Sequence, residues 1–128
     1  MAETYEGKLV LVVDDDPEIL GAITTTLEET GVDIETATDG NQAVEIAESK
    51  KPDLVILDIM LPQKSGFLVL ERIRKGKRRG EKPRIIMITG NQGRRHRQYA
   101  EALGVDEYLI KPFRMERLIE SVEKLLAD

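Results

Sequence analysis

The sequence predicts an α/β fold: one doubly wound, five-stranded parallel sheet in the order 2-1-3-4-5, with helices on both faces. Five short apolar runs alternate with five segments of helical periodicity, and no tight-turn signal joins neighbouring strands into hairpins. The runs at 9–13 and 54–57 are apolar throughout, as strands covered on both faces are, whereas residues 33–37 alternate and suit an edge strand. These patterns place the first and third strands inside the sheet and the second at its edge.

The first half of the chain supplies three strand–helix pairs, expected near residues 8–14 and 17–30, 33–37 and 40–49, and 53–58 and 65–75. Asp16 is the expected N-cap of the first helix, because Pro17 suits the first helical position and Glu18 the first turn. Gly31 follows this helix, at a place where a residue with a left-handed backbone commonly ends one. The third strand is the apolar run that stops at Asp58.

The second half supplies two further pairs, expected near residues 84–89 and 92–103, and 106–110 and 114–127. The fourth strand is a run of isoleucines and a methionine that ends at Thr89, and Gly104 stands just past the helix that follows. The last helix has a single apolar stripe, formed by Leu118, Ile119, Val122, Leu125 and Leu126. Each half therefore continues the same alternation of strand and helix.

The composition is that of one folded domain, residues 1–128. Hydrophobic residues make up 41% and charged residues 34% of the chain, which excludes a disordered protein, and 128 residues allow a single core. There is no cysteine, so disulfides and thiolate chemistry are excluded. The apolar runs are too short to span a bilayer, and residues 1–7 have no signal-peptide pattern. We expect a cytoplasmic domain with no membrane partner.

The net charge of −5 hides a marked asymmetry. Between Arg72 and Arg97 the chain has eleven Lys or Arg residues and one acid, a net charge of +10, and the remainder carries −15. The residues from Arg72 to Arg84 precede the fourth strand, whereas the cluster from Arg94 to Arg97 follows it. We therefore expect two basic patches at opposite edges of the sheet, the second placed to steer an acidic partner.

Carboxylates gather where two buried strands end. Asp14, Asp15 and Asp16 follow the first apolar run, and Asp58 ends the third. In a sheet of this order, ligands bind beyond the carboxyl ends of the strands where the strand order reverses, which here lies between the first and third strands. Crowded carboxylates repel one another unless a cation lies among them, and Mg²⁺ prefers oxygen ligands. The sequence predicts a magnesium site at Asp14, Asp15 and Asp58.

Two more polar groups follow strands at the same edge. Thr89 ends the fourth strand and Lys111 follows the fifth. A carboxylate can attack phosphorus to give an aspartyl phosphate, and a metal, an ammonium and a hydroxyl can then neutralise the equatorial oxygens. The set is complete for phosphoryl transfer to an aspartate.

These motifs resemble those of the receiver domains of two-component response regulators, which have the flavodoxin-like fold. The resemblance covers nearly the whole chain. It is carried by Val13-Asp14-Asp15, Asp58-Ile59-Met60-Leu61-Pro62 leading to Gly66, Thr89-Gly90, and Lys111-Pro112-Phe113. Each motif is short, but their order at successive strand ends is specific.

The resemblance implies that Asp58 is phosphorylated by a histidine kinase or a phosphotransfer protein. Asp15 would bind Mg²⁺ directly and Asp14 would help, largely through water, with the backbone carbonyl of Met60 as a further ligand. The protein would be a phospho-switch in signal transduction that assists its own phosphorylation and dephosphorylation, without turnover of an external substrate.

The resemblance also implies how the signal is read. Thr89 would turn toward the phosphoryl group, Lys111 would pair with it, and Tyr108 would be the aromatic switch. The Lys111–Pro112 peptide bond would be cis. A downstream target or output domain would then bind the face formed by the fourth helix, fifth strand and fifth helix, and direct binding of nucleic acid is not expected.

Other functions have weaker support. A phosphatase of the haloacid dehalogenase type usually has a second acid two residues after its nucleophile, and here that residue is Met60. A receiver that only scaffolds would not need every site position filled, and a nucleotide-binding module would need a glycine-rich loop after the first strand. A zinc site is poorly supported, because His96 is the only histidine and is expected to be a solvated helix residue.

Overall fold

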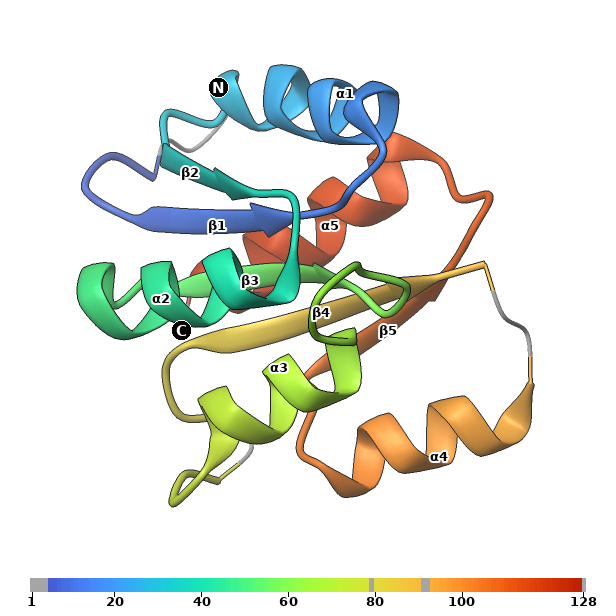
Figure 1. Ribbon diagram of the computed structural model, residues 1–128. Coiled ribbons are helices and arrows are strands. Elements are labelled where there is room, and N and C mark those ends of the chain that lie inside the picture. The colour runs from blue at the N-terminus through green and yellow to red at the C-terminus, as the bar shows by residue number, and fades with distance from the viewer. Residues whose placement is uncertain (1–4, 79, 91–92, 128) are drawn as a thin grey trace.

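A computed structural model describes residues 5–78, 80–90 and 93–127, and within them a single parallel sheet (Figure 1). The strands lie in the order β2-β1-β3-β4-β5, which confirms the predicted order. Their bounds are Leu9–Val13 (β1), Asp33–Ala37 (β2), Leu54–Asp58 (β3), Arg84–Thr89 (β4) and Glu107–Ile110 (β5). The helices are Pro17–Glu28 (α1), Gly40–Lys50 (α2), Gly66–Arg74 (α3), Arg94–Ala102 (α4) and Met115–Leu126 (α5). The predicted start of the fourth helix at Gln92 lies outside the described residues.

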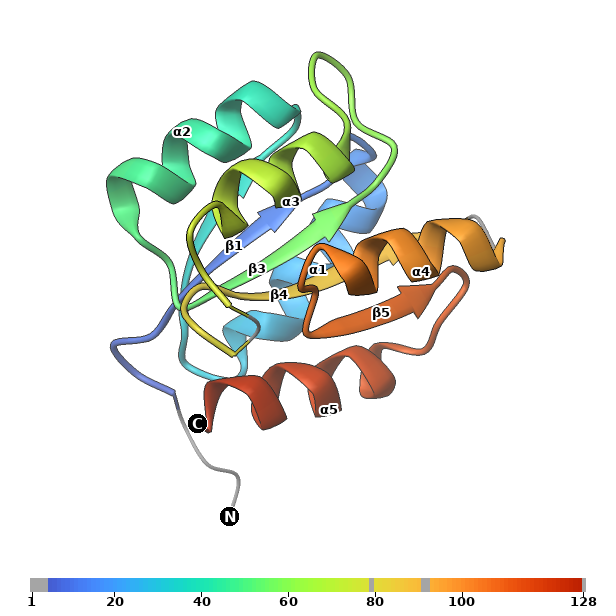
Figure 2. The ribbon, with the colours of Figure 1, turned by 90° about the horizontal axis from the view of Figure 1, so that it is seen from below.

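The core has two layers because successive residues of a strand point to opposite faces of the sheet. Val10 and Val12 of β1 pack with α1 and α5, whereas Leu11 and Val13 pack on the face that α2, α3 and α4 cover. Figure 2 shows the sheet between these two groups of helices. The described part of the chain contains no helix that is long and apolar enough to cross a membrane.

The helix ends follow local side-chain chemistry. The side chain of Asp16 accepts a hydrogen bond from the backbone N–H of Glu18 at 2.9 Å, which confirms the predicted cap of α1. Gly31 and Gly104 adopt φ angles of 84° and 94°, as predicted for residues that end helices. Lys51, which ends α2, also has a left-handed backbone, with φ 51°, although it is not a glycine.

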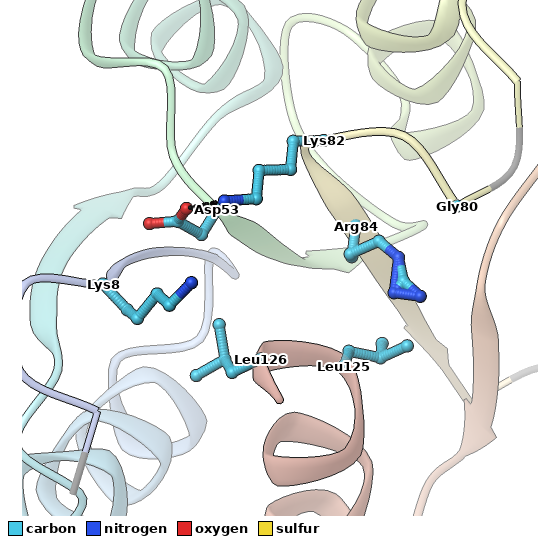
Figure 3. A pocket seen from close by; sticks show the side chains of 7 residues that line it. All are labelled: Lys8, Asp53, Gly80, Lys82, Arg84, Leu125 and Leu126. Atoms are coloured by element: carbon cyan, nitrogen blue, oxygen red, sulfur yellow. Dashed lines mark hydrogen bonds and ion pairs between the residues drawn. The ribbon is translucent and has the colours of Figure 1, made fainter. Parts of the chain in front are cut away.

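The described residues of the basic patch that precedes β4 lie at the edge where the strands begin, and the second patch, Arg94 to Arg97, follows the end of β4 in α4. This confirms the predicted separation of the two patches. Figure 3 shows Lys8, Lys82 and Arg84 around Asp53 at the first edge, beside the end of α5. Lys82 and Asp53 form an ion pair of 2.9 Å, and the backbone N–H of Leu9 donates to the same carboxylate.

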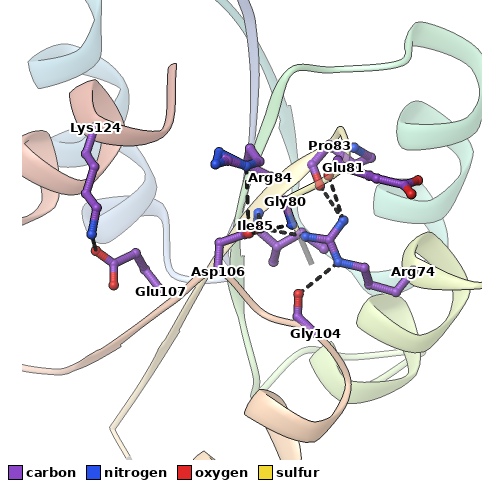
Figure 4. A network of polar contacts seen from close by, with 10 residues as sticks. All are labelled: Arg74, Gly80, Glu81, Pro83, Arg84, Ile85, Gly104, Asp106, Glu107 and Lys124. Carbon is purple, nitrogen blue, oxygen red and sulfur yellow. Dashed lines mark hydrogen bonds and ion pairs between the residues drawn. The ribbon is translucent and has the colours of Figure 1, made fainter. Parts of the chain in front are cut away.

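Arg74 belongs to the run of cations from Arg72 to Arg84 but is not part of that solvated surface. Its side chain is 4% exposed and forms an ion pair of 2.5 Å with Asp106, which is equally buried (Figure 4). The guanidinium also donates to three backbone carbonyls, those of Glu81, Pro83 and Gly104. The network joins the end of α3 to the loops that precede β4 and β5.

Candidate functional site

The carboxyl ends of β1 and β3 bring three carboxylates together. One oxygen from each of Asp14, Asp15 and Asp58 lies within 4.8 Å of the others. Asp14 and Asp58 are buried, with exposed fractions of 0% and 3%, whereas Asp15 is exposed. Because all the donors are oxygens and one side of the cluster faces solvent, the set fits a hard cation that keeps several of its waters, such as Mg²⁺. The structure thus assembles the three carboxylates that the sequence predicted.

Backbone groups fix the two buried carboxylates. One oxygen of Asp14 accepts a hydrogen bond from the N–H of Asp16 at 2.9 Å, and one oxygen of Asp58 accepts from the N–H of Met60 at 3.2 Å. Both bonds reach only two residues along the chain, so the turn after each strand orients its own carboxylate. In each case the second oxygen remains turned toward the other side chains of the site.

Lys111 bridges those second oxygens. Its Nζ lies 3.3 Å from an oxygen of Asp14 and 3.3 Å from an oxygen of Asp58. Burial alone would lower the pKa of the Lys111 ammonium, but Asp58 and Asp14 outweigh burial and raise it. The N–H of Lys111 donates to the carbonyl of Thr89 at 2.7 Å, and the Lys111–Pro112 bond is cis, as the sequence resemblance implied. A second cis bond, Lys82–Pro83, was not predicted.

Ionisation of the Asp58 carboxyl is disfavoured in the folded protein. Burial raises its pKa above the usual 3.8, and the charge of Asp14 raises it further, while Lys111 and the N–H of Met60 act in the opposite direction. Repulsion between two buried carboxylates is therefore only partly relieved by one ammonium. A bound divalent cation would relieve the remainder.

Replacing Asp58 by Asn should change how stability depends on pH in the metal-free protein. The folded state binds the Asp58 proton more tightly than the unfolded state, whose carboxyl titrates near 3.8. As the pH rises from 3.8 through the higher folded pKa, the parent should therefore lose stability relative to Asp58→Asn, and the difference should then level off. Urea unfolding with a chelator, from below pH 3.8 to neutral pH, measures this. A parent that gains stability relative to the variant over this range would contradict the shift.

Thr89 and Tyr108 lie at different positions along their strands. Thr89 is fully buried at the end of β4, next to the backbone of Lys111. Tyr108 pairs with Met87 nearer the start of the strands, and it is 7% exposed. The Tyr108 hydroxyl is buried and has no hydrogen-bond partner within the described ranges, and the guanidinium of Arg97 lies 5.6 Å from the ring centroid. No sequence pattern predicted the contact between Arg97 and Tyr108, because the two residues lie in separate elements, α4 and β5.

Two glycines hold the loops around Asp58 at close range. A Cβ on Gly66 would lie 2.3 Å from the backbone oxygen of Asp58, and a Cβ on Gly40 would lie 2.1 Å from the backbone oxygen of Lys64. Gly66 belongs to the motif quoted from the sequence, but Gly40 was not singled out. Any small residue suits the first turn of a helix, so only the packed structure identifies Gly40 as a contact to the loop after β3.

The sequence suggested that His96 is a solvated helix residue, and the structure shows that this is wrong. Its ring packs edge-on against Phe67 at 5.5 Å, and Phe67 makes a similar contact with Tyr99 at 4.9 Å. The hydroxyl of Tyr99 donates to Glu71 at 2.6 Å. These side chains fasten α4 to α3 and lie apart from the acidic cluster.

Comparison with known proteins gives one family. The profile of the response regulator receiver domain matches residues 10–123. The chain is 36% identical to the DNA-binding dual master transcriptional regulator RpaA of Synechocystis, over 91% of this chain and 48% of that protein. It is also 36% identical to the alkaline phosphatase synthesis transcriptional regulatory protein PhoP of Bacillus subtilis, over 94% of this chain and 49% of that protein. The chain thus spans about half the length of these curated relatives.

Solved structures agree with this result. The receiver domain of Francisella response regulator 1452 has a TM-score of 0.85 and 30% identity, covering 94% of this chain and 98% of that one. The receiver domain of a sensor histidine kinase from Pseudomonas aeruginosa has a TM-score of 0.82 and 29% identity, covering 95% and 99%. The latter structure has a magnesium ion coordinated in its active-site cleft.

Proposed function

Since this chain belongs to the response regulator receiver family of two-component signalling, we propose that Asp58 accepts a phosphoryl group from a histidine kinase or a phosphotransfer protein. The observation that carries the proposal is the position of Asp58, buried beside Asp14 and 3.3 Å from the Nζ of Lys111. A carboxylate so placed has a cation ready for the charge that arrives with the phosphoryl group. This geometry and the family both support the proposed acceptor role of Asp58.

The transfer needs an in-line displacement at phosphorus. A carboxylate oxygen of Asp58 forms a bond to phosphorus as the bond between phosphorus and the donor's histidine nitrogen breaks, and that nitrogen then takes a proton from solvent. Lys111 offsets the charge on the equatorial oxygens, and Thr89 supplies a hydroxyl at the end of the neighbouring strand. Water can later attack the acyl phosphate, which returns the carboxylate and releases phosphate.

Mg²⁺ is the cofactor that the donor set fits. Asp15, Asp14 and Asp58 would hold it, with the backbone carbonyl of Met60 as a further ligand. The ion would supply positive charge to the phosphoryl oxygens. The magnesium in the cleft of the related Pseudomonas receiver supports this assignment.

Acetyl phosphate with Mg²⁺ tests the proposal without a partner. The intact mass of the parent should rise by one phosphoryl group and return as the acyl phosphate hydrolyses. Asp58→Asn should not be labelled, whereas Asp33→Asn, which replaces an exposed acid on β2, should be labelled like the parent. Labelling of Asp58→Asn would assign the acceptor elsewhere, and sustained hydrolysis of p-nitrophenyl phosphate would favour a phosphatase of external esters.

A partner that delivers the phosphoryl group has an apolar surface to pack against. A groove of about 370 Å³ lies between α1 and the start of α5, next to the site lysine. Its apolar lining comes from Ile19, Ala22, Pro112, Phe113 and Met115. We propose that the donor protein covers this groove while its phosphohistidine reaches Asp58.

The phosphorylated state should be read through Thr89 and Tyr108 at the face of α4, β5 and α5. Lys111 joins the site to this face, because its ammonium contacts Asp58 and its backbone bonds to Thr89. Lys111→Ala should therefore reduce the change in amide exchange around Tyr108 that beryllofluoride, a phosphoryl mimic, causes in the parent. Equal changes in both proteins, at mimic concentrations that saturate both, would refute this coupling.

A further inference from the structure

A groove of about 640 Å³ lies at the edge of the molecule opposite Asp58, and we call it the basic groove. It is formed by the ends of α2 and α3, which pack side by side (Figure 2), and by the segments that lead into β3 and β4. Its charged lining consists of Lys51, Arg72, Lys75, Lys77 and Lys82, with Glu48 as the single acid. The groove therefore concentrates positive charge on a chain whose net charge is −5.

Internal ion pairs neutralise only part of this charge. Arg72 pairs with Glu48 at 2.9 Å, and Lys82 pairs with Asp53 at 2.9 Å. Lys51, Lys75 and Lys77 form no ion pair with any residue that the structure describes. Three ammonium groups in the lining of one groove, one at the end of α2 and two just after α3, are thus available to a ligand.

The floor of the groove is apolar, and its residues are Ala47, Pro52, Ile73 and Pro83. Concave sites that bind specific ligands commonly combine an apolar floor with a few charged groups at the rim. Among the described lining residues none is aromatic, so the groove offers no ring on which a nucleic-acid base could stack. The lining suits a chain that carries both carboxylates and an apolar side chain.

Lys51 provides an independent observation. Its backbone has φ 51°, a left-handed conformation that is unfavourable for most residues and that glycine adopts freely at helix ends. A lysine at this position keeps a side chain where the fold would be more stable without one. That side chain stands at the rim of the basic groove.

We infer that the basic groove binds an acidic polypeptide segment of a partner protein, with one apolar side chain on the floor and flanking carboxylates on Lys51, Lys75 and Lys77. The site is distinct from the phosphoacceptor. Residues 54–58 of β3 separate the two edges by about 17 Å at roughly 3.3 Å per residue. This distance exceeds the Debye length of about 8 Å at physiological salt, so the partner binds whether or not Asp58 carries a phosphoryl group.

A fluorescein-labelled peptide with one leucine between runs of glutamate and aspartate is the probe, and fluorescence anisotropy at low salt gives its Kd. The parent should bind it saturably, and binding should weaken with ionic strength. Replacing the leucine by serine should raise Kd about 10-fold or more, because the buried side chain is lost. Failure to saturate, or equal binding of the serine peptide, would overturn the inference. Preference for a DNA duplex of equal charge would assign the groove to nucleic acid instead.

Lys51→Gly is the most informative variant. It should raise Tm, because glycine adopts the left-handed backbone without strain, and yet raise the Kd of the peptide about 3-fold. The triple variant Lys51→Glu, Lys75→Glu, Lys77→Glu should raise the Kd of the peptide at least ~10-fold. A charge-matched triple on the other edge, Arg94→Glu, Arg95→Glu, Arg114→Glu, should change Kd much less, and Asp58→Asn should not change it. Equal losses in the two triples would show that net charge alone attracts the peptide and would overturn the site.

Discussion

Replacing Arg74 by methionine should lower the free energy of unfolding by about 3–5 kcal/mol, the usual result of removing one member of a buried ion pair. The variant keeps an unbranched chain of similar length, so the packing of α3 is little changed. It removes the closer of the two guanidinium groups beside the buried Asp106 carboxylate; the Nε of Arg84, at 3.7 Å, and the backbone N–H groups of Ile85 and Gly80 remain. It also leaves the carbonyls of Glu81, Pro83 and Gly104 without their donor.

Urea unfolding of the parent and of Arg74→Met measures the loss in free energy of unfolding. Two further variants serve as controls. Arg72→Met lies on the same helix but removes an exposed pair with Glu48, so it should cost less than about 1 kcal/mol. Arg74→Lys keeps the charge but cannot reach three carbonyls and Asp106 together, so it should fall between the two. A loss in Arg74→Met no larger than in Arg72→Met would show that the network does not stabilise the fold.

The network around Arg74 could not be predicted from the sequence, whereas the strands could. Strands and strand order could be predicted because a buried parallel strand must be apolar on both faces, and Val10 to Val13 and Leu54 to Leu57 satisfy that condition without exception. Arg74 lies within a run of cations, where charge pattern alone predicts solvent exposure. Its burial depends on Asp106, 32 positions away, and on carbonyls whose direction is set only when β4 and β5 pair.

The candidate site was more predictable than its surroundings for a related reason. The carboxyl ends of parallel strands lie at one edge of the sheet. Residues that end or follow strands, such as Asp14, Asp58 and Lys111, therefore lie close together for any path of the loops. The contacts of Gly40 with Lys64 and of Arg97 with Tyr108 each depend on the path of a loop or the placement of a helix, which sequence periodicity does not predict. His96 was misassigned because its aromatic partner, Phe67, is on a different helix.

The contact of Arg97 with Tyr108 bears on how a signal would leave the site. The ring lies under a guanidinium from α4, and its hydroxyl has no partner inside the described structure. A buried hydroxyl without a hydrogen bond costs free energy, which favours a position of Tyr108 in which the hydroxyl meets water. Burial also raises the pKa of Tyr108, against the charge of Arg97, so the buried side chain is neutral at physiological pH. This unpaired hydroxyl supports the proposal that Tyr108 is the aromatic switch.

Mg²⁺ should raise the Tm of the parent and should have little effect on Asp15→Asn. The ion binds the folded state only, because the three carboxylates meet only there, and at 100 times Kd such binding adds about 2.7 kcal/mol. For a domain of this size that corresponds to a shift in Tm of roughly 10 °C. In the absence of metal, Asp15→Asn should melt above the parent, because one of three mutually repelling carboxylates has been removed.

Thermal melts with and without Mg²⁺ give both results, and the neighbouring residue supplies the control. Asp16→Asn removes the same charge one position along, and asparagine caps α1 as well as aspartate does, so the fold is unchanged. This variant should keep the full Mg²⁺ response, which separates coordination by Asp15 from a general loss of negative charge near the ion. An undiminished Mg²⁺ response in Asp15→Asn would remove that residue from the metal site. Equal losses in both variants would mean that the cation is attracted by net charge rather than bound by the cluster at the ends of β1 and β3.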